Sequence, residues 1–298
     1  MRMTSPYFLA IAGNFIIKGK EPDGDSVRFV PDDPQRLTQL KNHSRIVPSK
    51  VDGSVQLRFE GIDAPELHYG GQAQPLGVEA RDKLLSWMGF TNIQYKTSPS
   101  TMVDSSTPAQ VPGTILSQQA EINGRPVSYV LVEADAAGLR DGRWTNVTDA
   151  VLEKSLNFRM IDQGLAYYTV YTSTPAAHRV RLRRAALAAR QAGRGVWPVD
   201  FTAEFVLKNQ ASVSAPDGEL ILPKLFRRCT DYLRDVTKGF RGNLADWIQT
   251  VSATGSRNEN DGVVVFDAFT VHLTDLLEQR NNRIAFLVDT LDVTFVEK

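Results

Sequence analysis

The sequence predicts an α+β protein that is built on a small β-barrel. Short segments with strand-like patterns come first in the chain, and segments with helical spacing lie between them and after them. That order favours an α+β barrel over a parallel sheet. The 298 residues are 42% apolar and 23% charged, so a real core is expected and wholesale disorder is excluded.

The length of the chain fits two domains better than one small domain. The character of the sequence changes after Trp197-Pro198. We therefore expect a barrel domain over residues 1–200. Residues 201–298 are expected to form a small α+β domain or extension of unknown function.

Four strands are predicted in the first part of the chain. Residues 7–19 and 25–30 are rich in β-branched and aromatic residues, and a Pro-Asp-Gly-Asp turn separates them. Residues 54–62 alternate between apolar and polar side chains, which indicates a half-buried strand with Arg58 on the polar face. Residues 126–133 have the composition of a further strand.

Three helices are predicted to accompany these strands. Residues 76–90 show helical spacing of leucine and alanine after Pro75, which favours a helix start. A second helix is predicted over about 148–163, ending at Gly164. A third is predicted over about 175–192.

Two segments between these elements are predicted to be irregular. Residues 31–53 contain three prolines and no clear period, which is typical of a loop or insertion. Residues 97–114 are rich in Ser, Thr and Pro and are expected to form an extended surface loop. In the C-terminal part, residues 221–236 and 241–251 are predicted to be helical.

The compartment is left open by the sequence. The apolar stretch Tyr7 to Ile17 is interpreted as a first strand, and a degenerate export signal is the alternative. A cytoplasmic location is therefore favoured, with a secreted or periplasmic one as the alternative. There is no run of about 18 apolar residues, so neither a transmembrane helix nor a membrane partner is expected.

Charge and cysteine content exclude several classes of function. Lys plus Arg and Asp plus Glu both number 34, so a uniform positive coat is excluded and nucleic-acid binding requires a local patch. Residues 201–298 carry a net charge of −3 and residues 1–200 a net charge of +3, which favours the first part as the one that meets an anion.

The single cysteine, Cys229, excludes an intramolecular disulfide framework and a cysteine-based zinc cluster, and we expect it to be a buried small hydrophobe. The four histidines are scattered, which argues against a histidine-rich metal site.

Two segments bring carboxylates and an arginine to strand ends. Asp23-Gly24-Asp25 offers oxygen ligands for a hard cation, or is an ordinary Asp-Gly turn. In the run from Arg58 to Glu66, Asp63 and Glu66 lie where the strand is expected to end. This arrangement suits one pocket that contains a guanidinium for a phosphate and carboxylates for a metal or a water molecule. The alternative is a surface ion pair between Arg58 and a nearby glutamate.

A third segment, Asn123-Gly124-Arg125, marks a tight turn before a strand and supplies a second arginine. In order along the chain, the three segments are followed by LNFRMIDQGLA and by an arginine-rich helix that ends in GVW. This series resembles the thermonuclease family, the staphylococcal-nuclease-like domains, over about residues 8–198. The resemblance implies a five-stranded OB-type β-barrel with three helices. It also implies cleavage of DNA and RNA phosphodiester bonds with calcium.

The resemblance assigns metal ligands by motif match. Asp25 and Asp63 would be the Ca²⁺ carboxylates, and the backbone carbonyl of Ala64 would be a further ligand. Asp23 would be an acidic neighbour that shapes the site without being a primary ligand. Two aspartates are enough to hold a calcium ion while leaving positions for water and phosphate.

The same motif match assigns catalytic roles. Glu66 would orient or deprotonate the attacking water, and Arg58 and Arg125 would bind the phosphate and stabilise its transition state. Arg125 departs from the family pattern because it is followed by Pro126.

Aromatic and basic side chains suggest nucleic-acid contacts, each with a structural alternative. Tyr168 and Tyr171 offer a base-stacking face or pack within the protein. The arginines of the helix at 175–192 either contact a phosphate backbone or form the solvated face opposite its leucines.

The sequence therefore predicts a Ca²⁺-dependent nuclease that acts on DNA and RNA, with single strands preferred and little sequence specificity. A non-catalytic OB-type module that binds nucleic acid or protein is the alternative. Residues 201–298, which are acidic and lack a catalytic cluster, are expected to bind a protein partner or a second copy of the chain.

Overall fold

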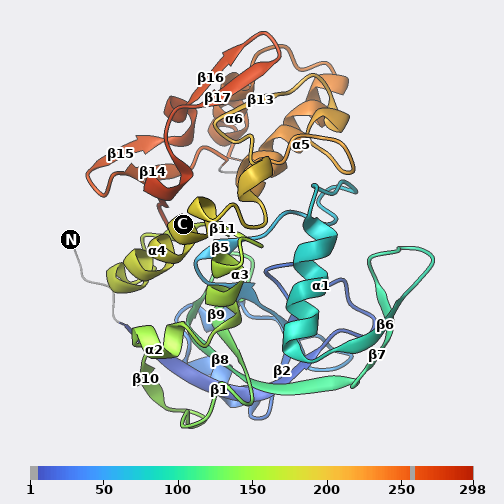
Figure 1. Cartoon of the computed structure of the whole chain (residues 1–298), viewed down its shortest axis with the longest axis vertical. Helices are drawn as coiled ribbons and strands as arrows, with labels where there is room; N and C mark the ends of the chain where they lie inside the picture. The colour runs from blue at the N-terminus through green and yellow to red at the C-terminus, as the bar shows by residue number, and fades with distance from the viewer. Residues whose placement is uncertain (1–5, 256–258, 298) are drawn as a thin grey trace.

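A barrel-like sheet and its helices lie at one end of the long axis of the molecule, and residues 201–298 lie at the other (Figure 1). This architecture comes from a computed structural model, which describes residues 6–255 and 259–297. The sheet is nearly closed, and its strand order is β3-β2-β1-β8-β9-β4, with β10 paired to β1. The predicted α+β class with an OB-type barrel and a C-terminal addition is confirmed.

Long antiparallel pairings form the centre of this sheet, because β1 pairs with β8 and β8 pairs with β9. A parallel pairing of β4 with β9 brings Arg58 beside Val127 at the edge. The strands of this sheet are β1 (Tyr7–Ile16), β2 (Arg28–Pro31), β3 (Val55–Gln56), β4 (Arg58–Phe59), β8 (Gln110–Ala120), β9 (Pro126–Val132) and β10 (Trp144–Asn146). The interpretation of the N-terminal apolar stretch as a first strand is thus confirmed.

The strand predicted over 54–62 is interrupted, and the interruption positions the site. It is divided into β3, β4 and β5 (Ile62–Asp63), and Gly61 adopts a left-handed φ of 78° in the turn before β5. Glu60, predicted on the polar face, is instead buried and accepts a hydrogen bond of 2.5 Å from the Thr174 hydroxyl. β5 pairs with β11 (Tyr167–Tyr168), which brings Asp63 opposite Tyr167.

Two further predictions are wrong in detail. The extended loop expected over 97–114 contains β7 (Val103–Thr107), which pairs with β6 (Thr91–Tyr95), and the start of β8. Its Ser and Thr residues are compatible with strands because β-branched threonine fits a pleated surface. The helix expected over about 148–163 is two helices, since the Ser155 side chain accepts a hydrogen bond from the Phe158 amide and caps a new helix.

The predicted helices at 76–90 and 175–192 are confirmed as α1 and α4. The helices of the first 200 residues are α1 (Gly77–Met88), α2 (Asp149–Leu152), α3 (Leu156–Asp162) and α4 (Ala176–Gln191). Their buried faces join the barrel interior in one apolar core, which continues into residues 201–298 through Phe226 and Trp247. No helix in the described part of the chain is long and apolar enough to cross a membrane.

The described part of residues 201–298 contains two α-helices and strands of two small sheets. The helices are α5 (Pro223–Thr237) and α6 (Leu244–Ala253), near the predicted positions. The strands are β13 (Glu204–Val206), β14 (Gly262–Val265), β15 (Phe269–His272), β16 (Leu277–Arg280), β17 (Arg283–Phe286) and β18 (Val293–Phe295). Cys229 lies on α5 and is fully buried, as expected, and burial raises the pKa of its thiol.

One of these sheets crosses the boundary near residue 200. Its order is β12-β18-β14-β15, and its first strand, β12 (Val170–Tyr171), comes from the barrel part of the chain. β12 pairs in parallel with β18 at the end of the chain. The C-terminal region is therefore attached to the barrel through backbone hydrogen bonds as well as through the shared core.

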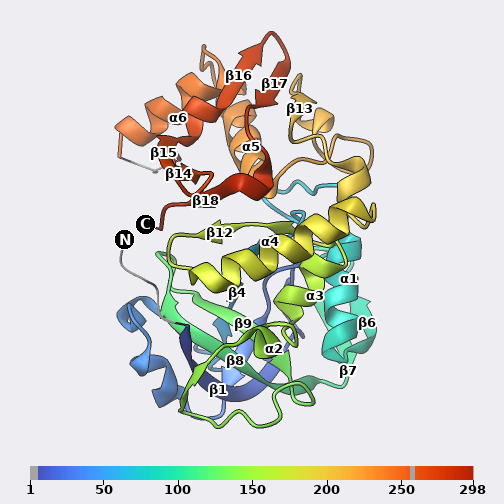
Figure 2. The same cartoon turned by 60° about the vertical axis from the view of Figure 1, so that its left-hand side comes forward.

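Helix α4 lies next to the C-terminal region (Figure 2), and three of its arginines bind acidic residues there. Arg179 and Arg183 bind Asp267 and Asp292 at 3.0 Å and 2.5 Å. Arg190 binds both carboxylate oxygens of Asp289 at 2.9 Å and 2.8 Å. These ion pairs leave Arg183 and Arg190 partly exposed while Leu182 is buried, which agrees with the solvated-face alternative.

Asn157 of α3 joins three backbone groups below the site. Its carbonyl oxygen accepts a hydrogen bond of 2.9 Å from the Val130 amide. Its side-chain amide donates to the Glu60 and Ser128 carbonyls at 2.9 Å and 3.0 Å. Because Asn157 is fully buried, water cannot replace these bonds. They fix the turn that leads to β5.

We expect Asn157→Ala to lower the free energy of unfolding by about 3 kcal/mol, since three buried polar groups lose their partner. Urea unfolding followed by circular dichroism measures the change. Asn146→Ala is the control, because Asn146 is exposed on β10, and it should change stability by less than about 0.5 kcal/mol. Equal stability of the two variants would contradict this role for Asn157.

Candidate active site

A pocket of about 680 Å³ lies between the end of the barrel and α5. The barrel part of the chain contributes both acidic and basic side chains, and the C-terminal region contributes Lys224, Arg227, Asp261 and Glu297. The pocket brings together most of the predicted site residues: Asp23, Asp25, Arg58, Asp63, Glu66, Arg125 and Tyr171.

Asp23 and Asp25 lie in the turn before β2. The Asp23 carboxylate accepts a hydrogen bond of 2.8 Å from the Gly24 amide. Burial, followed by the charge of Glu66, raises the pKa of Asp23 to about 7. Burial and the charges of Asp63, Asp23 and Glu66 raise the pKa of Asp25 well above its usual range. Both carboxyl groups therefore lose their protons less readily than an exposed aspartate does.

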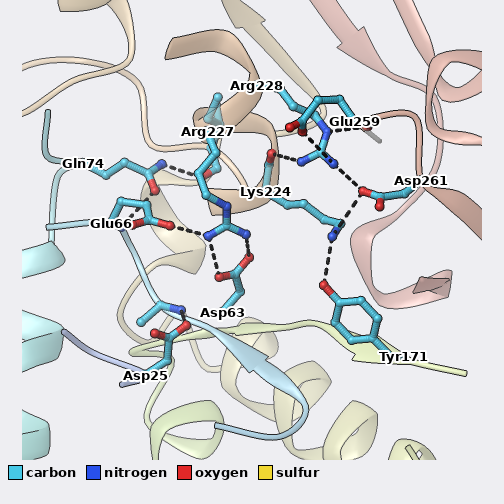
Figure 3. A network of polar contacts seen from close by, with 12 residues as sticks. Asp25, Asp63, Glu66, Gln74, Tyr171, Lys224, Arg227, Arg228, Glu259 and Asp261 are labelled. Carbon is cyan, nitrogen blue, oxygen red and sulfur yellow. Dashed lines mark hydrogen bonds and ion pairs between the residues drawn. The ribbon is translucent and has the colours of Figure 1, made fainter. Parts of the chain in front are cut away.

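Asp63 is the last residue of β5, and Glu66 follows that strand. Both side chains contact Arg227 of α5. Arg227 of α5 donates two parallel hydrogen bonds to Asp63, with Nη1–Oδ1 3.0 Å and Nη2–Oδ2 2.8 Å, and also binds Glu66 (Figure 3). Although burial opposes ionisation of Asp63, Arg227 and then Arg58 hold the pKa of Asp63 below its ordinary value. Burial alone would lower the pKa of Arg227, but Asp63 and Glu66 raise it well above the usual value.

The backbone of Glu66 is held by Gln74. The backbone amide of Glu66 donates to the Gln74 side-chain oxygen at 3.1 Å. The side-chain amide of Gln74 donates to the Ile221 carbonyl at 2.7 Å. Gln74 is buried, so it joins the segment after β5 directly to the start of α5.

The two predicted phosphate-binding arginines both line the pocket. The Arg58 guanidinium lies 4.5 Å from the centre of the Tyr171 ring. Arg125 donates from Nε to Glu121 at 3.0 Å, and its side chain is 35% exposed, so it reaches the pocket although Pro126 follows it. Glu121 thus holds Arg125 at the pocket wall.

The two predicted stacking tyrosines are separated by the structure. Tyr171 lines the pocket and accepts a hydrogen bond of 2.9 Å from Lys224. Burial alone would raise the pKa of Tyr171, but Arg58 and Lys224 lower it to about 8. Tyr168 is 5% exposed and does not line the pocket, because it is packed in the core on β11. A stacking role for Tyr168 is therefore not supported by its position.

The acidic corner suits a calcium ion in its chemistry but not in its present arrangement. Asp25 and Asp63 supply the carboxylate oxygens that Ca²⁺ prefers, and the charges of Asp63, Asp23 and Glu66 act on Asp25 in the same corner. However, Asp63 is turned toward Arg227, while Asp25 accepts a bond of 3.2 Å from the Ala64 amide (Figure 3). Among the described residues, no group of three or more His, Cys, Asp or Glu side chains is gathered to hold a metal.

The sequence patterns did not identify several of the pocket residues, among them His68, Glu121, Lys224 and Arg227. His68 and Glu121 flank motifs already recognised, at positions two residues after Glu66 and four before Arg125. Lys224 and Arg227 lie more than 150 residues from Asp63, on a helix without a recognisable motif. Their spacing of three residues on a helix was the available signal, since it places both side chains on one face.

Residues 56–199 match the model of a protein family described as staphylococcal nuclease homologue. The resemblance seen in the sequence is thereby confirmed, and the chain carries a staphylococcal-nuclease-like domain. The matched range contains Arg58, Asp63, Glu66 and Arg125, begins after Asp25 and ends before α5. A search among curated proteins found no match to the chain.

We expect Tyr171 to ionise near pH 8, because Arg58 and Lys224 stabilise its phenolate. The absorbance at 295 nm of the wild type minus that of Tyr171→Phe, followed against pH, should show a single transition there. Lys224→Met should move this transition to higher pH, since it removes one of the positive charges. A difference spectrum without a transition below pH 10 would contradict the prediction.

Proposed function

We propose that this chain is a calcium-dependent nuclease that hydrolyses phosphodiester bonds of DNA and RNA with little sequence specificity. The observation that supports it best is the arrangement of Arg58, Asp63, Glu66 and Arg125 around one pocket, within a domain that matches a nuclease family. We also propose that single strands are preferred as substrates.

The proposed roles follow from position and charge. Arg58 and Arg125 would neutralise the phosphodiester, and their contribution grows as charge develops on the phosphoryl oxygens. Glu66 would hold the attacking water and accept its proton. Asp25, Asp63 and the Ala64 carbonyl would hold Ca²⁺, which would stabilise charge on the phosphoryl group when bound.

The alternative function is a non-catalytic OB-type module that binds nucleic acid or protein. It is favoured by the contact of Arg227 with Asp63 and Glu66, because this contact engages two of the side chains that hydrolysis requires. The two functions differ in one measurable respect, since a binding module retains single-stranded DNA without cutting it.

We also propose that residues 201–298 form a C-terminal domain, joined to the barrel through the shared core and sheet, that binds a protein partner or a second copy of the chain. The change in sequence character near residue 200 and the acidic balance of this region support the proposal. Three acidic residues of this region already form ion pairs within the molecule, because Asp267, Asp289 and Asp292 bind arginines of α4.

With single-stranded DNA or RNA and millimolar Ca²⁺, the full chain is expected to release short fragments, and EDTA is expected to stop the release. Denaturing gel electrophoresis follows the cleavage. If no divalent cation supports chelator-sensitive cleavage, while a mobility-shift assay shows binding, the binding module is the correct function.

We expect Glu66→Gln to lower kcat by about 100- to 1000-fold with little change in KM, because the water loses its base while the phosphate contacts remain. Initial rates on a fluorescent oligonucleotide separate the two constants. Glu79→Gln is the matched control, since Glu79 is exposed on α1, and it should keep the wild-type rate. An equal effect of both substitutions would argue against a role for Glu66.

A further inference from the structure

Arg227 binds both Asp63, which is proposed as a Ca²⁺ ligand, and Glu66, which is proposed to hold the attacking water. Its guanidinium binds both oxygens of Asp63 and one oxygen of Glu66. Asp63 is 5% exposed, so these bonds replace most of its contact with water. Paired hydrogen bonds between a guanidinium and a carboxylate are among the stronger polar contacts in proteins.

Binding of Arg227 and binding of a divalent cation require different orientations of the Asp63 carboxylate. A metal ion shared with Asp25 requires the Asp63 carboxylate to turn toward Asp25. In Figure 3 this carboxylate is turned toward Arg227 instead. A guanidinium and a calcium ion on one carboxylate also repel each other, and the repulsion is strong where little water screens it. The two cations are therefore competitors for Asp63.

The position of Arg227 is fixed by contacts of its helix that do not involve Asp63 or Glu66. α5 begins next to the Gln74–Ile221 hydrogen bond. One helical turn beyond Arg227, Asp231 accepts a hydrogen bond of 2.8 Å from Tyr69. The neighbouring residue Arg228 is held by Asp261 at 2.5 Å. Because the helix is anchored on both sides of it, Arg227 is directed into the pocket by the fold.

We propose that Arg227 is a built-in competitor of the divalent cation, so that the site takes up metal only when the Arg227 side chain leaves Asp63 and Glu66. The C-terminal region thereby regulates the site of the barrel through one side chain. This inference rests on the proposed function, because it takes Asp63 as a metal ligand.

Isothermal titration of the full-length protein with CaCl₂ tests the proposal. Arg227→Gln should bind Ca²⁺ at least about tenfold more tightly than the wild type, because the competing charge-assisted bonds are gone. Arg241→Gln is the matched control, since it removes the same charge from an exposed side chain between α5 and α6. Its affinity should stay within about twofold of the wild type.

A second measurement uses the wild-type protein and does not depend on the folding of a variant. Phenylglyoxal modifies free guanidinium groups, and peptide mass spectrometry gives the rate at Arg227. Saturating Ca²⁺ should increase this rate several-fold and leave the rate at Arg241 unchanged. A rate at Arg227 that Ca²⁺ does not increase, under conditions where calorimetry shows binding, would overturn the proposal.

The outcomes separate this inference from the proposed function. Equal Ca²⁺ affinity of the wild type and Arg227→Gln, with nuclease activity present, overturns the competition and leaves the nuclease. Absence of Ca²⁺ binding in both proteins overturns the competition together with the calcium requirement. Tighter binding in Arg227→Gln alone supports the competition whether or not the chain cuts nucleic acid.

Discussion

The attachment of residues 201–298 to α4 and β12 is the constraint on which the pocket depends. Three arginines of α4 bind acidic residues of the C-terminal region, and β18 pairs in parallel with β12, the strand that carries Tyr171. Exposed ion pairs contribute little singly, at about 0–1 kcal/mol each. Here they act together with a shared apolar core and backbone hydrogen bonds, and they orient the region rather than supply most of its stability.

This attachment also explains the charge balance of the chain. The net +3 of the first 200 residues and the net −3 of the remainder partly neutralise each other within the molecule. A zero net charge is thus compatible with a locally charged pocket. Inside it, burial and the neighbouring carboxylates raise the pKa of Asp25, and Arg227 and then Arg58 lower the pKa of Asp63.

Local patterns predicted much of the barrel and most of the site. Alternation predicted the strands around Arg58. The Arg58–Glu66 spacing placed the guanidinium and both carboxylates in one pocket because β4, β5 and the segment after β5 follow one another closely in the chain. The buried position of Glu60 depends on Thr174, and that of Tyr168 depends on the pairing of β11 with β5. Both contacts join segments far apart in the chain, which periodicity cannot detect. Arg227 was not predicted for the same reason, since its partners Asp63 and Glu66 lie about 160 residues earlier in the chain.

The place of β18 in its sheet has a consequence for the order in which the chain becomes structured during synthesis. β18 lies between β12 and β14 although it is nearly the last segment of the sequence. The ribosome therefore releases the whole barrel part, with its carboxylates and arginines, before this sheet can be completed. The nascent chain passes through a stage in which the barrel end still lacks the neighbour that the finished protein places over it.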